Sequence, residues 1–130
     1  MIEVELKIFV KNITRLEEQL LKKGFTEGNS LKESDYYLDD ESGSIRNHDQ
    51  ALRIRCSQDL SSGVITNTIT YKGPKLDTIS MTRKELEIIV ENELEKNEAL
   101  EQLLELLEEL GYQKKDIITK SYLSMLQNLP

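Results

Sequence analysis

The first residues of the chain alternate between apolar and charged side chains. Aliphatic residues occupy positions 2, 4, 6 and 8, and the charged residues Glu3, Glu5 and Lys7 stand between them. Because side chains of a strand point alternately to its two faces, this pattern predicts a strand with one apolar and one charged face. Two carboxylates about 7 Å apart along a strand, followed by an ammonium group, could hold a divalent cation beside an anion. Taken alone, the pattern also fits a half-buried strand with a solvated charged face.

Five later segments have a similar strand pattern, and short turns or loops join several of them. They cover residues 35–39, 50–58, 64–72, 81–90 and 112–122. Residues 25–32 are interpreted as a connection, with a short strand within it as the alternative. Residues 40–49 are interpreted as an irregular polar loop, and residues 123–130 show no clear pattern. Strands joined by short connections favour antiparallel pairing.

Two helices are predicted among these strands. Thr14 and Glu17 have the spacing of a capping box, so the first helix should begin at Thr14, and Gly24 should end it. The second should begin at Asn92 or Asn97 and bury a stripe of leucines that ends at Leu110. The expected fold is a single α+β domain over residues 1–130, an antiparallel sheet with two flanking helices.

The net negative charge of the chain is concentrated in one segment. The net charge of −7 comes from 17 basic and 24 acidic residues, but residues 91–110 hold eight glutamates against one lysine and therefore carry all of it. Overall charge thus says little about what the strands bind. Cys56 is the single cysteine of the sequence, so an internal disulfide is excluded. We expect its thiol to be buried and the protein to reside in a reducing cytoplasm. No apolar run approaches the roughly 18 residues of a spanning helix, so no membrane association is expected.

Cations and carboxylates recur on the polar faces of the predicted strands. These residues are Glu3, Glu5, Lys7, Arg53, Arg55, Lys72, Arg83, Glu85, Glu87 and Lys120. Arginine binds phosphate oxygens through two parallel hydrogen bonds, and carboxylates hold Mg²⁺, which bridges phosphate oxygens. Such a face suits a metal ion together with a polyphosphate. A solvated face with cross-strand ion pairs is the alternative.

Five short motifs carry a resemblance to a known family. They are Glu3-Val4-Glu5-Leu6-Lys7, Asp35-Tyr36-Tyr37-Leu38-Asp39, Ala51-Leu52-Arg53-Ile54-Arg55, Thr70-Tyr71-Lys72-Gly73-Pro74-Lys75 and Arg83-Lys84-Glu85-Leu86-Glu87. In this order they resemble the CYTH family, the class IV adenylyl cyclases and thiamine triphosphatases among the triphosphate tunnel metalloenzymes. The resemblance covers roughly residues 1–120.

The resemblance implies a β-barrel whose tunnel is lined by these charges. It implies triphosphate binding by Lys7, Arg53, Arg55, Lys72, Arg83 and Lys120. It also implies that Glu3 and Glu5 bind Mg²⁺ or Mn²⁺. Glu85 and Glu87 would be the catalytic carboxylates, acting on metal or on a nucleophilic water.

The C-terminal part departs from the family pattern. Lys120-Ser121-Tyr122 stands where the family usually has Lys-x-Arg, and the family's further strands have no counterpart in residues 123–130. Six strands would leave an eight-strand tunnel incomplete. A homodimer that completes the open sheet, an incomplete site and a truncated gene product are the possibilities.

Two classes of function follow. The first is an enzyme acting on ATP, thiamine triphosphate or tripolyphosphate, with the adenylyl cyclase reaction favoured over triphosphate hydrolysis. The second is a non-catalytic polyphosphate or nucleotide binder. Nucleic acid is not an expected partner, because the interleaved glutamates would repel its backbone.

Overall fold

The computed structural model describes residues 10–76, 82–92 and 97–126. The chain divides into two compact units, Met1–Gly28 with Leu123–Pro130 and Asn29–Tyr122, and each is described by itself. The predicted first strand lies outside the described residues, and so do Glu3, Glu5 and Lys7.

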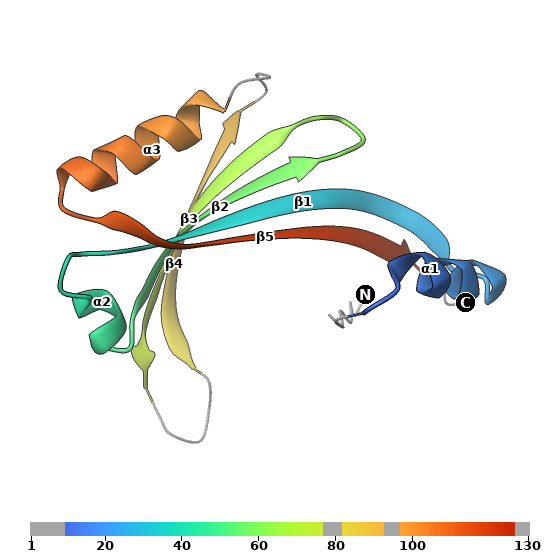
Figure 1. Ribbon diagram of the computed structural model, residues 1–130, viewed down its shortest axis with the longest axis horizontal. Coiled ribbons are helices and arrows are strands. Elements are labelled where there is room, and N and C mark those ends of the chain that lie inside the picture. The colour runs from blue at the N-terminus through green and yellow to red at the C-terminus, as the bar shows by residue number, and fades with distance from the viewer. Residues whose placement is uncertain (1–9, 77–81, 93–96, 127–130) are drawn as a thin grey trace. The chain divides into compact units, whose positions relative to one another are not determined.

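A five-stranded sheet forms the centre of the larger unit (Figure 1). In chain order its strands are β1 (Thr26–Asp39), β2 (Ala51–Asp59), β3 (Ile65–Lys75), β4 (Arg83–Asn92) and β5 (Gln113–Leu126). Their order across the sheet is β4-β3-β2-β1-β5, and the pairs β1–β2, β2–β3 and β3–β4 are antiparallel. Among the described residues the sheet is open, with β4 and β5 at its edges. The predicted antiparallel α+β architecture is confirmed.

Strand lengths differ from the prediction at three places. β1 begins at Thr26, so residues taken for a connection belong to a 14-residue strand. β3 continues through Gly73 and Pro74 to Lys75, with a register shift between Lys72 and Lys75. β5 continues to Leu126. Pairing with a neighbouring strand accompanies two of these extensions, at Leu31 opposite Asp59 in β1 and at Lys75 opposite Arg83 in β3.

Helix α3 (Glu98–Glu109) lies against one face of the sheet, where the residue before it, Asn97, bonds to Asn67 of β3 and Cys56 of β2. The predicted burial of its leucine stripe is confirmed only in part: Leu100, Leu103, Leu104 and Leu107 are half-buried, and Leu110 is 67% exposed. Leu38 and Ile54, which are 3% and 0% exposed, belong to the face that α3 covers. The amides of Asn97 and the fully buried Asn67 hydrogen-bond each other in both directions, at 2.8 and 3.1 Å. Asn97 also caps the helix by accepting a bond from the Leu100 amide. Of the two predicted helix starts, Asn97 is the correct one.

Cys56 lies at the same junction between sheet and helix. Its sulfur accepts a hydrogen bond of 3.0 Å from Nδ2 of Asn97, and burial raises the pKa of its thiol. Cys56 is half-buried, less than the predicted full burial, and a raised pKa keeps its thiol protonated, as expected of a structural cysteine. This agrees with the predicted position on the apolar face.

A short helix, α2 (Ser44–Asn47), lies in the segment interpreted as irregular. Two consecutive aspartates hold its beginning. The buried carboxylate of Asp39 accepts bonds from the backbone amides of Ile45 and Arg46 at 3.0 and 3.1 Å. The carboxylate of Asp40 accepts bonds from the backbone amide and the hydroxyl of Ser44. Asp39, quoted above as part of a family motif, is thus a structural residue.

The titration of Asp40 tests this arrangement. The Ser44 hydroxyl and then the Ser44 backbone amide lower the pKa of Asp40 to about 2. An aspartate in an unfolded chain titrates near 3.9, so the stabilisation is complete above that pH and is lost as the pH falls towards 2. We expect an NMR midpoint near pH 2 for the carboxyl carbon, moved upward by Ser44→Ala. A midpoint near 4 in the unchanged protein would contradict these bonds.

Helix α1 (Ile13–Lys22) belongs to the smaller unit. Its N-cap is Asn12, whose side chain accepts a bond of 3.1 Å from the Arg15 amide, so the predicted start at Thr14 was wrong. Asn12 is an equally good cap and stands two residues earlier. Gly24 follows the helix with φ of 91°, a left-handed conformation that suits glycine and confirms the predicted end. Whether α1 covers the sheet stays a prediction.

Candidate functional site

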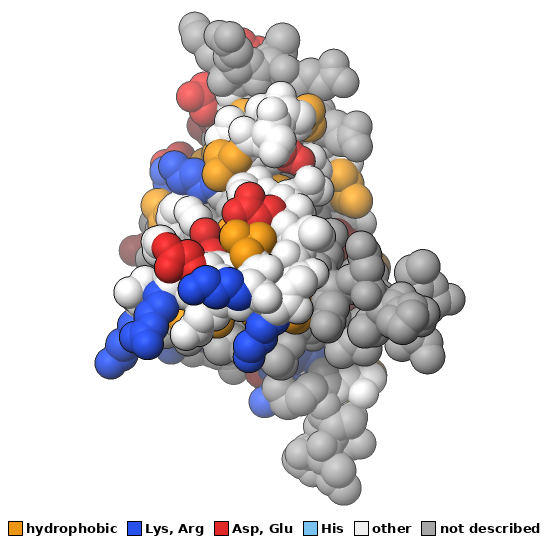
Figure 2. Space-filling view, turned by 90° about the vertical axis from the view of Figure 1, so that its right-hand side faces the viewer, with side chains coloured by type: hydrophobic (Ala, Val, Ile, Leu, Met, Phe, Trp, Pro, Cys, Tyr) orange, Lys and Arg blue, Asp and Glu red, His pale blue; other side chains and the backbone are white. Residues whose placement is uncertain are grey.

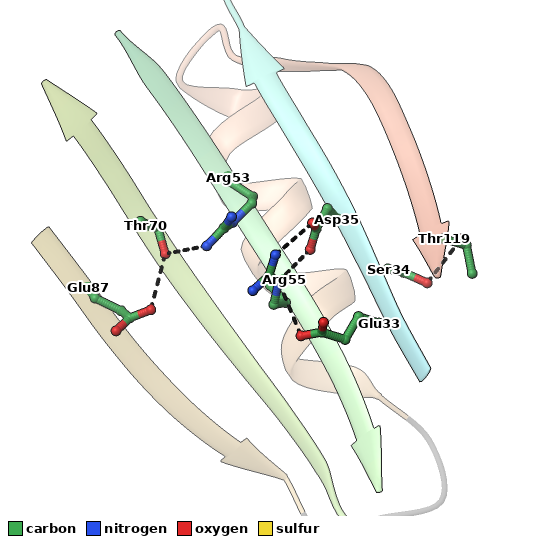
Figure 3. A network of polar contacts seen from close by, with 8 residues as sticks. All are labelled: Glu33, Ser34, Asp35, Arg53, Arg55, Thr70, Glu87 and Thr119. Atoms are coloured by element: carbon green, nitrogen blue, oxygen red, sulfur yellow. Dashed lines mark hydrogen bonds and ion pairs between the residues drawn. The ribbon is translucent and has the colours of Figure 1, made fainter. Parts of the chain in front are cut away.

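The strand register collects polar side chains on the face of the sheet opposite α3, which we call the charged face (Figure 3). Directly opposite pairs share a face. One row across the sheet consists of Tyr37, Arg53, Thr70 and Glu87. The row on one side of it pairs Asp35 with Arg55, and the row on the other side pairs Lys72 with Glu85. The charged face therefore brings together five of the predicted site residues: Arg53, Arg55, Lys72, Glu85 and Glu87.

Arg55 is held by two carboxylates of β1. Its Nε and Nη2 donate to the two carboxylate oxygens of Asp35 at 2.7 and 3.0 Å, and Glu33 lies 3.3 Å from Nε. Burial by itself would raise the pKa of Asp35. The hydrogen bond and charge of Arg55, with the charges of Arg53 and Lys120, lower it instead. The pair is therefore ionised and its guanidinium is largely occupied.

The guanidinium group of Arg53 has fewer hydrogen-bond partners than that of Arg55. Its Nη2 lies 3.5 Å from the Thr70 hydroxyl, at the limit of a hydrogen bond, and Glu87 lies 3.5 Å from the same hydroxyl. Nε of Arg53 is buried and has no hydrogen-bond partner among the described residues. A buried donor without a partner costs free energy, on the order of 1–3 kcal/mol. An anion that accepts from this guanidinium would remove that cost.

Lys72 and the two carboxylates of β4 complete the charged face. Nζ of Lys72 lies 3.4 Å from Glu85, and both side chains are well exposed, at 39% and 57%. Glu85 and Glu87 are two residues apart on β4, so they share a face about 7 Å apart. An exposed ion pair of this kind contributes little to stability and can be exchanged for a ligand at small cost.

Arg83 makes different contacts. Its Nη1 donates to the backbone oxygens of Asp49 and Gly73 at 3.0 and 3.2 Å, and its Nη2 donates to the Asp49 carboxylate at 3.2 Å. Asp49 also accepts a bond from the Lys75 amide. In the structure Arg83 thus ties β4 to the segment before β2, and its predicted phosphate role stays untested.

Lys120 is exposed on β5, two strands from Arg53. The hydroxyls of its neighbour Thr119 and of Ser34, which stands opposite Cys56 on the α3 face, are hydrogen-bonded, so alternation places Lys120 on the charged face. Over the described residues, acidic and basic side chains lie close together on the side of the molecule drawn in Figure 2. No helix of the described residues is both long and apolar enough to cross a membrane.

Comparison with known proteins assigns the family. The CYTH domain profile matches residues 1–85 of the 130. The chain belongs to the CYTH domain family. It is also 34% identical over 120 residues to "Putative adenylate cyclase MJ0240" of Methanocaldococcus jannaschii, an alignment that covers 92% of this chain and 61% of that protein.

Two solved structures have a similar fold. The PH1819 protein of Pyrococcus horikoshii is 26% identical, with a TM-score of 0.63, over 85% of this CYTH chain and 58% of that chain. A "putative adenylate cyclase" of Vibrio parahaemolyticus shares the fold at 18% identity, with a TM-score of 0.54, over 89% of this chain and 57% of that one. The CYTH chain thus spans about three fifths of the length of these relatives.

The described part of the CYTH chain contains no cluster of three or more His, Cys, Asp or Glu side chains that could hold a metal ion. Glu85 and Glu87 nevertheless offer carboxylate oxygens beside two cations, Arg53 and Lys72. Mg²⁺ is commonly held by one or two carboxylates together with the phosphates of its substrate. The donor set therefore fits a cation that binds with a polyphosphate.

Asp35 is the most important residue of the charged face that was not proposed as a site residue. It was quoted in a motif, but its role follows from its position opposite Arg55 across two strands. The sequence does contain a signal, because Asp35 and Arg55 both fall on the polar faces of predicted strands. The register that joins them is a long-range property, which alternation alone does not give.

Proposed function

We propose that the charged face binds the triphosphate of a small molecule with a divalent cation, and that the reaction is that of a class IV adenylyl cyclase. The observation that carries this proposal is the Arg53 guanidinium, with a buried Nε that has no partner among the described residues, beside Lys72. Membership of the CYTH family and the names of two relatives support it.

The residues of the charged face have different proposed roles in binding the triphosphate. Arg53 and Lys72 bind phosphate oxygens, the first through directed hydrogen bonds and the second as a point charge. Arg55 adds positive charge, and its bonds to Asp35 fix its orientation. Lys120 adds charge from β5. Lys7 and Arg83 remain further candidate phosphate ligands.

Mg²⁺ or Mn²⁺ would neutralise charge on the phosphoryl oxygens when bound. Of the described residues, Glu85 and Glu87 would hold it together with the phosphates. Glu3 and Glu5 are the proposed metal ligands outside the described residues.

In the proposed reaction the 3′-hydroxyl of ATP attacks the α-phosphorus and pyrophosphate leaves. Cyclic AMP forms, and the hydroxyl proton passes to a base. Glu85 or Glu87 is the proposed acceptor, since both carboxylates lie on the same face as Arg53. The cations stabilise the charge that develops on the phosphoryl oxygens.

Product analysis tests the proposal. The purified chain is incubated with ATP, thiamine triphosphate or tripolyphosphate and with Mg²⁺ or Mn²⁺, and the products are followed by ³¹P NMR and chromatography. Cyclic AMP with an equal amount of pyrophosphate is expected from ATP, and Glu85→Gln with Glu87→Gln should abolish it. Inorganic phosphate would instead identify a triphosphatase. Tight tripolyphosphate binding without products would identify a non-catalytic binder.

A further inference from the structure

Strand β3 contains a bulge beside Lys72, at the end of the charged face. Between Lys72 and Lys75 the strand advances by three residues, while β4 advances by two, from Glu85 to Arg83. Strict alternation would place the two lysines on opposite faces, but the extra residue in the bulge changes this. In the observed register Lys72 stands opposite Glu85 and Lys75 stands opposite Arg83. Because directly opposite residues share a face, both lysines lie on the charged face.

Side chains of two neighbouring segments hold the bulge. The pairing of β2 with β3 ends at Lys72, and beyond it the backbone amide of Lys75 donates to the Asp49 carboxylate at 3.0 Å. Nη1 of Arg83 donates to the backbone oxygens of Gly73, within the bulge, and of Asp49, and its Nη2 donates to the Asp49 carboxylate. Asp49 has a φ of 55°, a left-handed conformation that is uncommon outside glycine. These bonds satisfy backbone groups where a bulge interrupts the ladder.

The bulge extends a series of positive charges along the strands. Successive rows of the charged face carry Arg55, Arg53, Lys72 and Lys75, and Figure 3 shows the first two of them side by side on β2. Neighbouring rows are about 7 Å apart. Lys75 is exposed, and its ammonium group forms no ion pair within the described part of the chain. A long, flexible cation in this position can bind an anion that already contacts Lys72.

We infer that Lys75 is a further phosphate-binding residue, that the bulge brings it to the charged face, and that Arg83 and Asp49 position it there. This inference rests on the proposed function for the site of the triphosphate. It places the phosphates along the strands, from Arg53 past Lys72 towards Lys75. Arg83 then acts through Lys75, and its directed bonds matter more for phosphate binding than its charge.

The role of Lys75 is tested by isothermal titration calorimetry with tripolyphosphate. Lys75→Met should weaken binding about fivefold, the upper end of the effect of one exposed ion pair. Lys84→Met is the matched control, because Lys84 is an exposed lysine that alternation places on the opposite face of β4. The affinity of this control should stay within about twofold of that of the unchanged protein. Equal affinities in the two variants would overturn the inference and leave the proposed function standing.

The positioning role of Arg83 is tested with Arg83→Lys, which keeps the charge but loses the two-pronged geometry. Its affinity for tripolyphosphate should fall about as far as that of Lys75→Met. The double variant Arg83→Lys with Lys75→Met should bind hardly more weakly than Lys75→Met alone, because both changes remove the same contact. A general loss of stability would not produce this dependence on Lys75. Additive losses would show that Arg83 contacts the phosphates itself, and an unchanged affinity in Arg83→Lys would show that its bonds position nothing. Either result would overturn the positioning role.

A separate outcome concerns the proposed function. If the unchanged protein binds no tripolyphosphate, the proposed function and the phosphate-binding role of Lys75 are both overturned. Amide hydrogen exchange then tests the bonds at the bulge, since a protected amide exchanges only when the local structure opens. Slow exchange of the Lys75 amide that becomes fast in Arg83→Lys would retain the structural part of the inference. Equal exchange rates in the two proteins would overturn that part as well.

Discussion

Replacing Arg55 with methionine should lower the free energy of unfolding by about 3 kcal/mol, the low end of the cost for a buried ion pair, because Asp35 is buried but the Arg55 side chain is 26% exposed. The substitution leaves the buried carboxylate of Asp35 without its two charge-assisted bonds. Urea denaturation followed by circular dichroism measures the change. Arg55 was predicted as a phosphate ligand, and the structure adds that it holds β1 and β2 together.

Two further variants make this result specific. Glu33→Gln removes the outer, less direct ion pair of Arg55 and should cost less than about 1 kcal/mol. Replacing both partners, Asp35→Leu with Arg55→Met, should recover most of the lost stability, because no unpaired charge is left buried. If Arg55→Met unfolds at the same urea concentration as the unchanged protein, the ion pair does not contribute to stability.

The faces of the strands were predictable because they depend on local alternation. Arg53 and Arg55 were predicted on one face of their strand and Ile54 and Cys56 on the other, and the structure confirms these two faces. Lys72 and Glu85 were likewise expected on one surface. Each of these residues lies within a segment of strong β propensity, where the period of two is hard to mistake.

The lengths of the elements were less predictable. The beginning of β1, residues 26–34, contains Gly28, Asn29 and two serines, which have low strand propensity. Over residues 31–34 pairing with β2, such as Ser34 opposite Cys56, accompanies the strand. Tertiary context has overridden local preference.

Contacts between distant segments were not predictable from the pattern. Arg83 binds Asp49, which is 34 positions away, and Asp39 caps a helix that begins five residues later. In both cases a charged side chain that resembles a ligand in the sequence satisfies backbone groups instead. A charged residue in a family motif can therefore serve the loop geometry around a site, and only the fold distinguishes the two roles.

Replacing Arg53 with methionine should weaken tripolyphosphate binding by about fiftyfold, the loss expected for removing charge-assisted hydrogen bonds worth about 2–3 kcal/mol. Stability should change by less than about 1 kcal/mol, since the side chain makes only the 3.5 Å contact with Thr70 within the part of the chain that the structure describes. The Arg53 substitution should thus lower affinity with little effect on stability, whereas the Arg55 substitution should lower stability. Calorimetric titration and urea denaturation of the same preparations measure both quantities.

Arg15→Met is the matched control, because it removes the same charge from an exposed position of α1. The affinity of this variant for tripolyphosphate should stay within about twofold of that of the unchanged protein, because removing one screened surface charge has only a small effect. Arg53→Lys should bind more tightly than Arg53→Met but more weakly than the unchanged protein, because lysine supplies the charge without the two-pronged geometry. Equal affinity in Arg53→Met and the unchanged protein would show that the phosphates bind elsewhere. A loss of stability as large as that of Arg55→Met would show that Arg53 has a structural role, which its contacts do not indicate.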